Sequence, residues 1–99
     1  MRIIARRTLR EFWEGAGHQD SEQPLRAWFA EASKTDWATP ADIKRQHRNA
    51  SLIGKSRVIF NIGGNKNPLV VAIKYASRIL FIRFVGTHAD YDRIDVEAV

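Results

Sequence analysis

The residue types best suited to chemistry on a phosphate group cluster near the end of the sequence. Arg83 supplies a fixed positive charge, His88 an imidazole that changes protonation near neutral pH, and Tyr91 a phenol. When an RNA 2′-hydroxyl attacks the neighbouring phosphate, it must lose a proton, the phosphorane gains negative charge, and the 5′-oxygen must gain a proton. These three residues therefore suit phosphodiester cleavage without a metal, although the same groups can also bind phosphate without cutting it.

Several other chemistries are disfavoured by what the sequence lacks. The chain has no Cys, and hence no disulfide, thiolate zinc site or thiol nucleophile. It has no Walker loop or dinucleotide fingerprint, and Gly63-Gly64 is typical of a hairpin tip because no helix start follows it. His18 and His47 are far from His88 and have no spaced acid partners, so we expect them on the surface and expect no metal or other cofactor.

The composition predicts one folded, basic domain over residues 1–99. The sequence is 44% hydrophobic and 10% aromatic, as globular proteins are, and carries a net charge of +5. This charge favours a polyanionic partner, which can be nucleic acid, a ribosome or an acidic protein. The apolar runs are shorter than the ~18 residues needed to cross a bilayer, and no signal peptide opens the chain, so we expect a cytoplasmic protein without membrane contact.

Three β-rich runs at 57–62, 69–75 and 79–85, separated by turn-rich breaks, predict an antiparallel meander. Alternation along the strands divides the side chains between two faces. The apolar face, expected to pack on helices, carries Val58, Phe60, Ile62, Leu69, Val71, Ile73, Tyr75, Leu80, Ile82 and Phe84. The opposite face, called here the cationic face, carries Arg57, Ile59, Asn61, Val70, Ala72, Lys74, Ile79, Phe81 and Arg83. Its charges are all positive and it keeps large apolar groups, which favours a ligand surface over an ordinary polar sheet face.

The first third of the chain predicts a strand and two helices. Residues 1–5 are β-prone and are expected to pair with the meander. Apolar residues then recur at helical spacing from residue 6 to the glycines at 15–17, and again from a cap at Asp20 or Ser21 to about Thr35. The two stripes are expected to form core in an αα-hairpin, and consist of Leu9, Phe12, Trp13, Leu25, Trp28 and Phe29.

Two short helices are predicted from their caps. Thr39 and Pro40 open the first, which runs to about His47. Its cations either offset the helix dipole at a solvated helix end or form an anion-facing ridge. Thr87 and Asp90 have capping-box spacing, and the helical turn that they predict places His88 and Tyr91 on one face. The cations of the first helix are Lys44, Arg45, His47 and Arg48. The apolar residues of the last four positions indicate a tail that is frayed or pairs with another chain.

Three longer motifs carry a resemblance to a known family. They are D-W-A-T-P-A-D-I-K at 36–44, V-I-F-N-I-G-G-N-K at 58–66 and F-I-R-F-V-G-T-H-A-D-Y-D at 81–92. Together with M-R-I-I at 1–4 and P-L-R-A-W at 24–28, they resemble the HigB toxins of bacterial type II toxin–antitoxin systems over nearly the whole chain. The resemblance implies the RelE-like α+β fold, a small antiparallel β-sheet with two N-terminal helices packed on one face.

The same resemblance implies an mRNA interferase, which is an endoribonuclease acting on mRNA in the ribosomal A site. It also implies silencing by a cognate HigA-like antitoxin with a helix-turn-helix, so that operator DNA is contacted only through the antitoxin complex. The expected partners are therefore this antitoxin, mRNA and the 70S ribosome.

The positions that match the family motifs imply which residues form the catalytic and RNA-binding site. Arg83, His88 and Tyr91 are the expected catalytic residues, and Asn61 and Asp92 are expected to bind RNA. Lys55, Arg57 and Lys74 complete the expected RNA-binding set, chiefly through the argument from the cationic face. Two other function classes stay open: a ParE-like gyrase poison that cuts nothing, and a non-enzymatic RNA- or ribosome-binding module. The first is disfavoured because an inhibitor needs no pair of proton-transfer groups.

Overall fold

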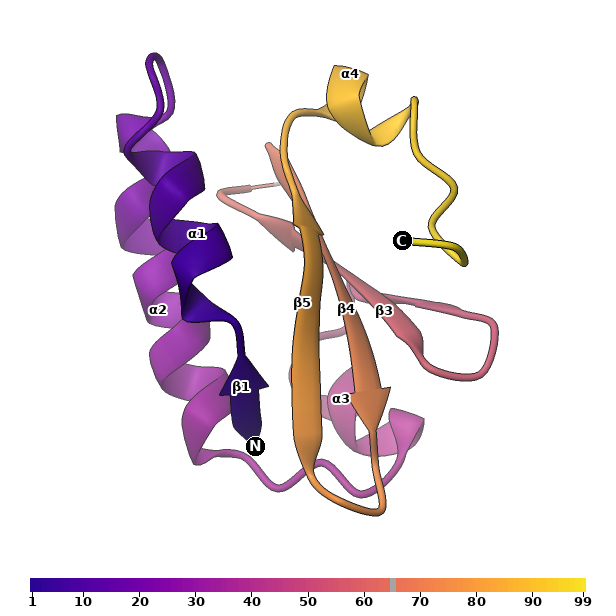
Figure 1. Cartoon of the computed structure of the whole chain (residues 1–99). Helices are drawn as coiled ribbons and strands as arrows, with labels where there is room; N and C mark the ends of the chain where they lie inside the picture. Colours follow the sequence, from indigo (N-terminus) through magenta and orange to yellow (C-terminus); the bar gives the residue numbers. More distant parts are fainter. Residues whose placement is uncertain (65) are drawn as a thin grey trace.

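The computed structural model describes residues 1–64 and 66–99 (Figure 1), so part of the hairpin tip predicted at 63–66 lies outside the described residues. Its elements are β1 (Arg2–Ile4), α1 (Arg6–Trp13), a 3-10 turn (Gln19–Ser21), α2 (Glu22–Lys34), α3 (Pro40–Gln46), β2 (Ser51–Ile53), β3 (Arg57–Ile62), β4 (Asn67–Lys74), β5 (Ile79–Val85) and α4 (His88–Tyr91). The strands form one sheet in the order β1-β5-β4-β3-β2, antiparallel except for the β1–β5 pair. The predicted α+β fold and the predicted N-terminal strand are confirmed.

The core lies between the apolar face and the two N-terminal helices, as the alternation predicts. Figure 1 shows α1 and α2 together on one side of the sheet. Buried residues of the helices meet buried residues of β3, β4 and β5 in one cluster, while Phe12, Phe29 and Tyr75 are partly buried against it. This cluster includes Leu9, Trp13, Leu25, Trp28, Val58, Phe60, Ile62, Leu69, Val71, Ile73, Leu80 and Ile82.

A β-bulge in β5 changes the side-chain alternation near the strand's end. Val71 pairs with Ile82 while Val70 pairs with Phe84, so Arg83 is an extra residue without a partner on β4. The predicted place of Phe84 on the apolar face is therefore wrong, since Phe84 lies opposite Val70 on the cationic face. Val85 takes its place against the core.

The cationic face is covered along its middle, contrary to the expectation that it stays open. Ile59, Val70 and Ala72 are 6%, 0% and 6% exposed. The chain after α4 turns back over this side of the sheet (Figure 1). Arg57 donates a hydrogen bond of 2.8 Å from Nη2 to the main-chain oxygen of Val99. The expected frayed or externally paired tail is therefore folded on the chain's own sheet.

The side-chain caps of the helices agree with the sequence in two cases of three. Capping boxes open α3 and α4 as predicted. Ser21 is the N-cap residue of α2, as predicted, but its side chain makes no capping bond: the hydroxyl donates to the main-chain oxygen of His18 at 2.6 Å, and Asp20 pairs with Lys66. Ser21 therefore stabilises the turn that joins the helices, and Asp20 links this turn to Lys66.

The cations after Pro40 do not form a free ridge. Lys44 donates from Nζ to the main-chain oxygens of Arg48 and Ala50, at 2.7 and 2.8 Å, and Arg45 pairs with Asp42. Lys44 therefore fastens the chain between α3 and β2, while Arg45 is paired within α3.

Candidate functional site

The position of His88 and Tyr91 is set by a capped helical turn at the end of β5. The Thr87 hydroxyl oxygen accepts from the Asp90 main-chain N–H at 3.1 Å, and the Asp90 carboxylate accepts from the Thr87 main-chain N–H at 3.4 Å. The two bonds close the first turn of α4 and leave few orientations open to it.

Asn67 and Gly86 anchor this turn to the sheet. Asn67 is 3% exposed and donates from Nδ2 to the main-chain oxygen of Gly86 at 3.0 Å. The Gly86 N–H in turn donates to the Pro68 main-chain oxygen at 3.3 Å. A Cβ on Gly86 would lie 2.7 Å from Cζ of Phe84, so a larger residue there would displace the ring. Sequence reasoning missed both residues, since Asn-Pro and Gly were interpreted only as turn formers.

Tyr91 packs on the residue that the bulge moves. The rings of Phe84 and Tyr91 have centroids 6.5 Å apart and are tilted by 50°. Because Phe84 lies on the cationic face, Tyr91 lies on that side of the sheet too. Within α4, Tyr91 is half-buried and His88 is exposed, while Asp92 caps the end and is also exposed.

Arg83 and Lys74 flank one aromatic ring on the cationic face. The Arg83 guanidinium carbon lies 5.2 Å from the centroid of Phe81, and Lys74 Nζ lies 6.0 Å from it. Both cations are exposed while the ring is half-buried. These cation–π contacts with the ring restrict the movement of each charged group.

Arg57 shares this face with Arg83, as the alternation predicts. Arg57 pairs with Ala72, and Ala72 pairs with Phe81, so the three residues lie in one row across the sheet. The Arg57 guanidinium is engaged by Ser56 and Val99. Glu97 lies beside Gly54, so the returning chain brings an acid to a face whose strands supply only cations. The expectation that this face carries only positive charge is therefore corrected at the turn before β3.

The remaining expected RNA-binding residues lie at opposite ends of β3. Asn61 pairs with Pro68 at the end of the sheet that carries Gly86, and donates from Nδ2 to the Asn49 main-chain oxygen at 3.5 Å. Lys55 lies in the exposed turn between β2 and β3, apart from α4. Arg83 and Lys74 thus flank Phe81, and Arg57 lies in the same row as Phe81, two strands away.

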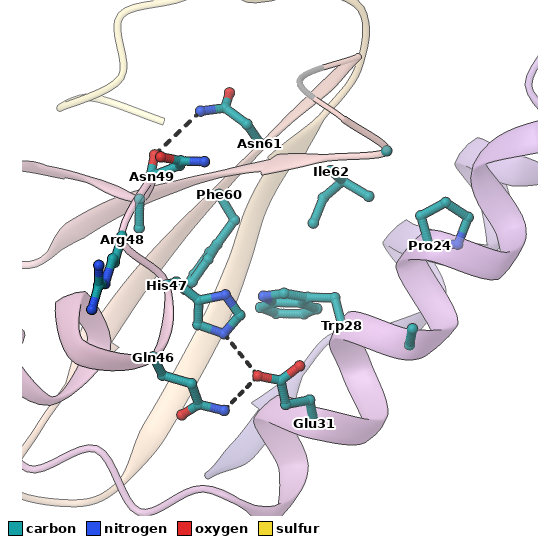
Figure 2. Close-up of a pocket in the computed structure, with 13 residues that line it drawn as sticks. Pro24, Trp28, Glu31, Gln46, His47, Arg48, Asn49, Phe60, Asn61 and Ile62 are labelled. Carbon is teal, nitrogen blue, oxygen red and sulfur yellow. Dashed lines mark hydrogen bonds and ion pairs between the residues drawn. The ribbon is translucent and has the colours of Figure 1, made fainter.

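A cavity of about 410 Å³ opens beside Asn61, between α2, the 46–50 segment and β3 (Figure 2). His47 lies at this cavity, with its ring 5.1 Å from Phe60 and 5.7 Å from Trp37, and its Nε2 is 3.3 Å from Glu31 Oε1. That distance suits an ion pair when the imidazole is protonated, although the geometry is not that of a hydrogen bond.

The expectation that His47 and His18 lie on the surface holds only in part, since both are half-buried against aromatic rings. His18 stacks on Phe12 with centroids 4.4 Å apart. Each imidazole covers an aromatic ring, a role that spacing along the sequence does not reveal.

Two pKa shifts stand out, and both lie outside the group around α4. The pKa of Asp42 is lowered, chiefly by the Ala38 main-chain N–H and further by Thr39 and Arg45, while burial raises the pKa of Tyr75. Within residues 1–64 and 66–99, no cluster of three or more His, Cys, Asp or Glu could hold a metal ion. In the same part of the chain, no helix combines the length and apolarity needed to cross a membrane.

Comparison with known proteins places this arrangement in a family. A model of the HigB toxin family, described as the RelE-like toxic component of a toxin–antitoxin system, matches residues 21–94. Curated proteins yield no match. The match spans α2, the sheet from β2 to β5, and α4, which together hold every candidate site residue described above. The chain therefore belongs to the HigB toxin family and is the RelE-like toxin of a toxin–antitoxin system.

Proposed function

We propose that this toxin is an endoribonuclease that cleaves mRNA on the ribosome. One observation carries the proposal: a capped turn, anchored to the sheet, holds His88 and Tyr91 beside the end of β5, the strand that carries Arg83 on the cationic face. Arginine, imidazole and phenol together supply the charge and the proton carriers that RNA transesterification needs.

The reaction assigns one task to each group. The 2′-oxygen loses its proton and bonds to phosphorus, the bond from phosphorus to the 5′-oxygen breaks, and the 5′-oxygen takes up a proton. The products are a 2′,3′-cyclic phosphate and a 5′-hydroxyl. Arg83 stabilises the charge that develops on the phosphate oxygens, His88 transfers a proton, and Tyr91 orients the phosphate or transfers the other proton.

Binding of the substrate falls to residues around this group. Arg57 begins β3 and Lys74 ends β4 on the cationic face, and Lys55 lies in the turn just before β3. Asn61 and Asp92 complete the proposed RNA-binding set. Separation of Arg57 from Val99 accompanies RNA binding in this proposal, because that bond uses the guanidinium.

A toxin of a toxin–antitoxin system has a cognate antitoxin. We propose that it is a HigA-like helix-turn-helix protein and that operator DNA is bound only by the complex. Free toxin would then meet mRNA and the 70S ribosome in the cytoplasm.

The test is expression of His88→Ala and Arg83→Ala in a bacterium at matched protein levels. Losing a proton-transfer group costs about 10²–10⁴ in rate, so each variant should lose growth arrest and mRNA cleavage. His18→Ala and Arg7→Ala are matched controls, since they remove the same side chains from the helical side of the molecule. Both controls should stay toxic, and all four variants should still bind the antitoxin.

Full toxicity of both site variants would overturn the assignment. Arrest without RNA cleavage would favour a gyrase poison if DNA breaks appear. Arrest with neither RNA nor DNA cleavage would favour a binding module that blocks the ribosome.

A further inference from the structure

The cavity beside Asn61 contains a polar donor that no protein group satisfies. Trp28 is 4% exposed, and within the described part of the chain its indole Nε1 has no hydrogen-bond acceptor. Figure 2 shows the nitrogen-bearing edge of this indole facing His47 across the cavity. A buried N–H without an acceptor costs about 1–3 kcal/mol, so the site favours an occupant that brings an acceptor.

A carboxylate is held in place on the same wall. Oε1 of Glu31 accepts a hydrogen bond from the Gln46 side-chain amide and lies 3.3 Å from His47 Nε2. Gln46 is itself held by a bond of 3.1 Å from Trp37 Nε1 to its Oε1. These contacts fix the carboxylate through one oxygen and leave Oε2 to accept from a ligand. Figure 2 shows Glu31, His47 and Trp28 turned toward the same space.

The mouth of the cavity meets the proposed path of RNA. Asn61 belongs to the cationic face yet also lines the cavity, and the exposed Arg48 lines it too. A nucleotide whose phosphate lies near Arg48 could therefore place its base inside while the neighbouring nucleotides follow the sheet. The floor is aromatic, formed by Trp28 and Phe60.

We propose that this cavity binds one unpaired guanine of the RNA substrate. Guanine presents an acceptor, O6, directly beside two donors, N1–H and the N2 amino group. The cavity offers the complement: Trp28 Nε1–H for O6, and Oε2 of Glu31 as the acceptor for the adjacent N1–H and N2 amino group. Cytosine and adenine lack the paired donors, and uracil has only one. Proteins commonly read single-stranded RNA through such base edges and aromatic surfaces. The inference rests on the proposed function, because it takes RNA as the substrate.

The test is binding of short single-stranded RNAs with 2′-O-methyl sugars, which cannot be cleaved by their own 2′-oxygen. The central base is guanine, inosine, adenine, cytosine or uracil, and fluorescence anisotropy gives each Kd. Guanine should bind about tenfold or more tighter than adenine, and inosine, which lacks the N2 amino group, should lose much of that advantage. Guanosine monophosphate as competitor separates binding of the base itself from binding that needs a longer strand.

Glu31→Gln should abolish the preference for guanine while leaving adenine-centred RNA bound. Glu14→Gln is the matched control, since Glu14 is an exposed acid at the end of α1 and its loss changes the net charge equally. The indole N–H signal of Trp28, identified by its loss in Trp28→Phe, should shift on addition of guanine-centred RNA while the signal of Trp13 stays.

Equal affinity for all five bases, or a Trp28 signal that does not move, would overturn the guanine site. Cleavage assays on the same protein keep this result separate from the proposed function. If the toxin cleaves mRNA but binds all bases equally, only the proposed guanine site is contradicted. If the protein prefers guanine-centred RNA but cleaves nothing, the guanine site is supported and the proposed nuclease activity is contradicted.

Discussion

At the scale of single residues, the bulge at Arg83 shapes the candidate site more than any other local feature. It turns Phe84 to the cationic face, where Tyr91 packs on it, while Arg83 stays beside Phe81 on the face that alternation gives it. One extra residue in β5 thus brings the support for the Tyr91 phenol to the side of the sheet that carries Arg83. Regular alternation would have placed Phe84 in the core and left Tyr91 without that contact.

Tyr91→Phe separates the hydroxyl from the ring that packs on Phe84. If the phenol transfers a proton, RNA cleavage should slow by about 10²-fold or more, with an unchanged Tm because the ring contact persists. Tyr75→Phe serves as control, since Tyr75 packs against the core at the far end of β4. A Tyr91→Phe protein as fast as the parent would assign this side chain a packing role only.

At the scale of elements, the hydrogen bond from Asn67 to Gly86 joins the start of β4 to the turn that carries α4. Asn67→Ala leaves the buried Gly86 oxygen unpaired, which should cost about 1–3 kcal/mol of unfolding free energy. Each kcal/mol lowers the Tm of a domain this size by about 4–8 °C. Cleavage should fall as well, because α4 loses its anchor.

Ile73→Val distinguishes the two effects. It shortens a buried side chain on the apolar face, at a cost of about 0.5–1.5 kcal/mol, without touching α4. At a temperature where both proteins are folded, this control should cleave normally while Asn67→Ala does not. Normal cleavage by Asn67→Ala would show that the anchor serves stability alone.

The capping box of α3 predicts a pH dependence. The main-chain N–H of Ala38, above all, lowers the pKa of Asp42 from 3.8, so folding favours the ionised carboxylate. A lowered folded-state pKa contributes stability that is complete above about pH 3.8 and is lost as the pH falls through the folded value. Asp42→Asn should therefore be less stable than the parent near neutral pH, and the difference in urea midpoint should shrink in acid. A difference that is constant from neutral to acidic pH would contradict this role.

The elements follow closely from sequence because their signals are local. Periodicity predicts α1 and α2 and the three long strands, and the Thr39 and Thr87 caps predict α3 and α4. Two features were not predicted because they depend on contacts between distant segments. They are the bulge at Arg83, which alternation cannot show, and the hydrogen bond from Arg57 to the C-terminal tail.

The candidate site was predictable only in part for the same reason. Residues with chemical groups, such as His88 and Arg83, are visible in any sequence. Asn67 and Gly86 act by holding a turn in place. Glu31 lies beside His47 although the two residues are sixteen positions apart in the sequence. Such partners become visible only once the chain has folded.

At the scale of the whole molecule, the two sides of the sheet have different tasks. The apolar face and the helices hold the fold, and the proposed guanine cavity lies on their side of the sheet, between α2 and β3. The other side presents the cations and the α4 turn. The acidic tail covers part of that side and binds Arg57, so the RNA path must compete with it. A net charge of +5 still favours association with a polyanion as large as the ribosome.

The most direct test of this account is cleavage of mRNA by the purified toxin, with and without 70S ribosomes and in the presence of a metal chelator. Sequencing of the fragments locates the cut, and end analysis identifies the terminal groups. The account predicts cleavage on the ribosome, insensitive to the chelator, with 2′,3′-cyclic phosphate and 5′-hydroxyl ends that disappear in His88→Ala. Intact mRNA under every condition, or equal cleavage by His88→Ala, would contradict it.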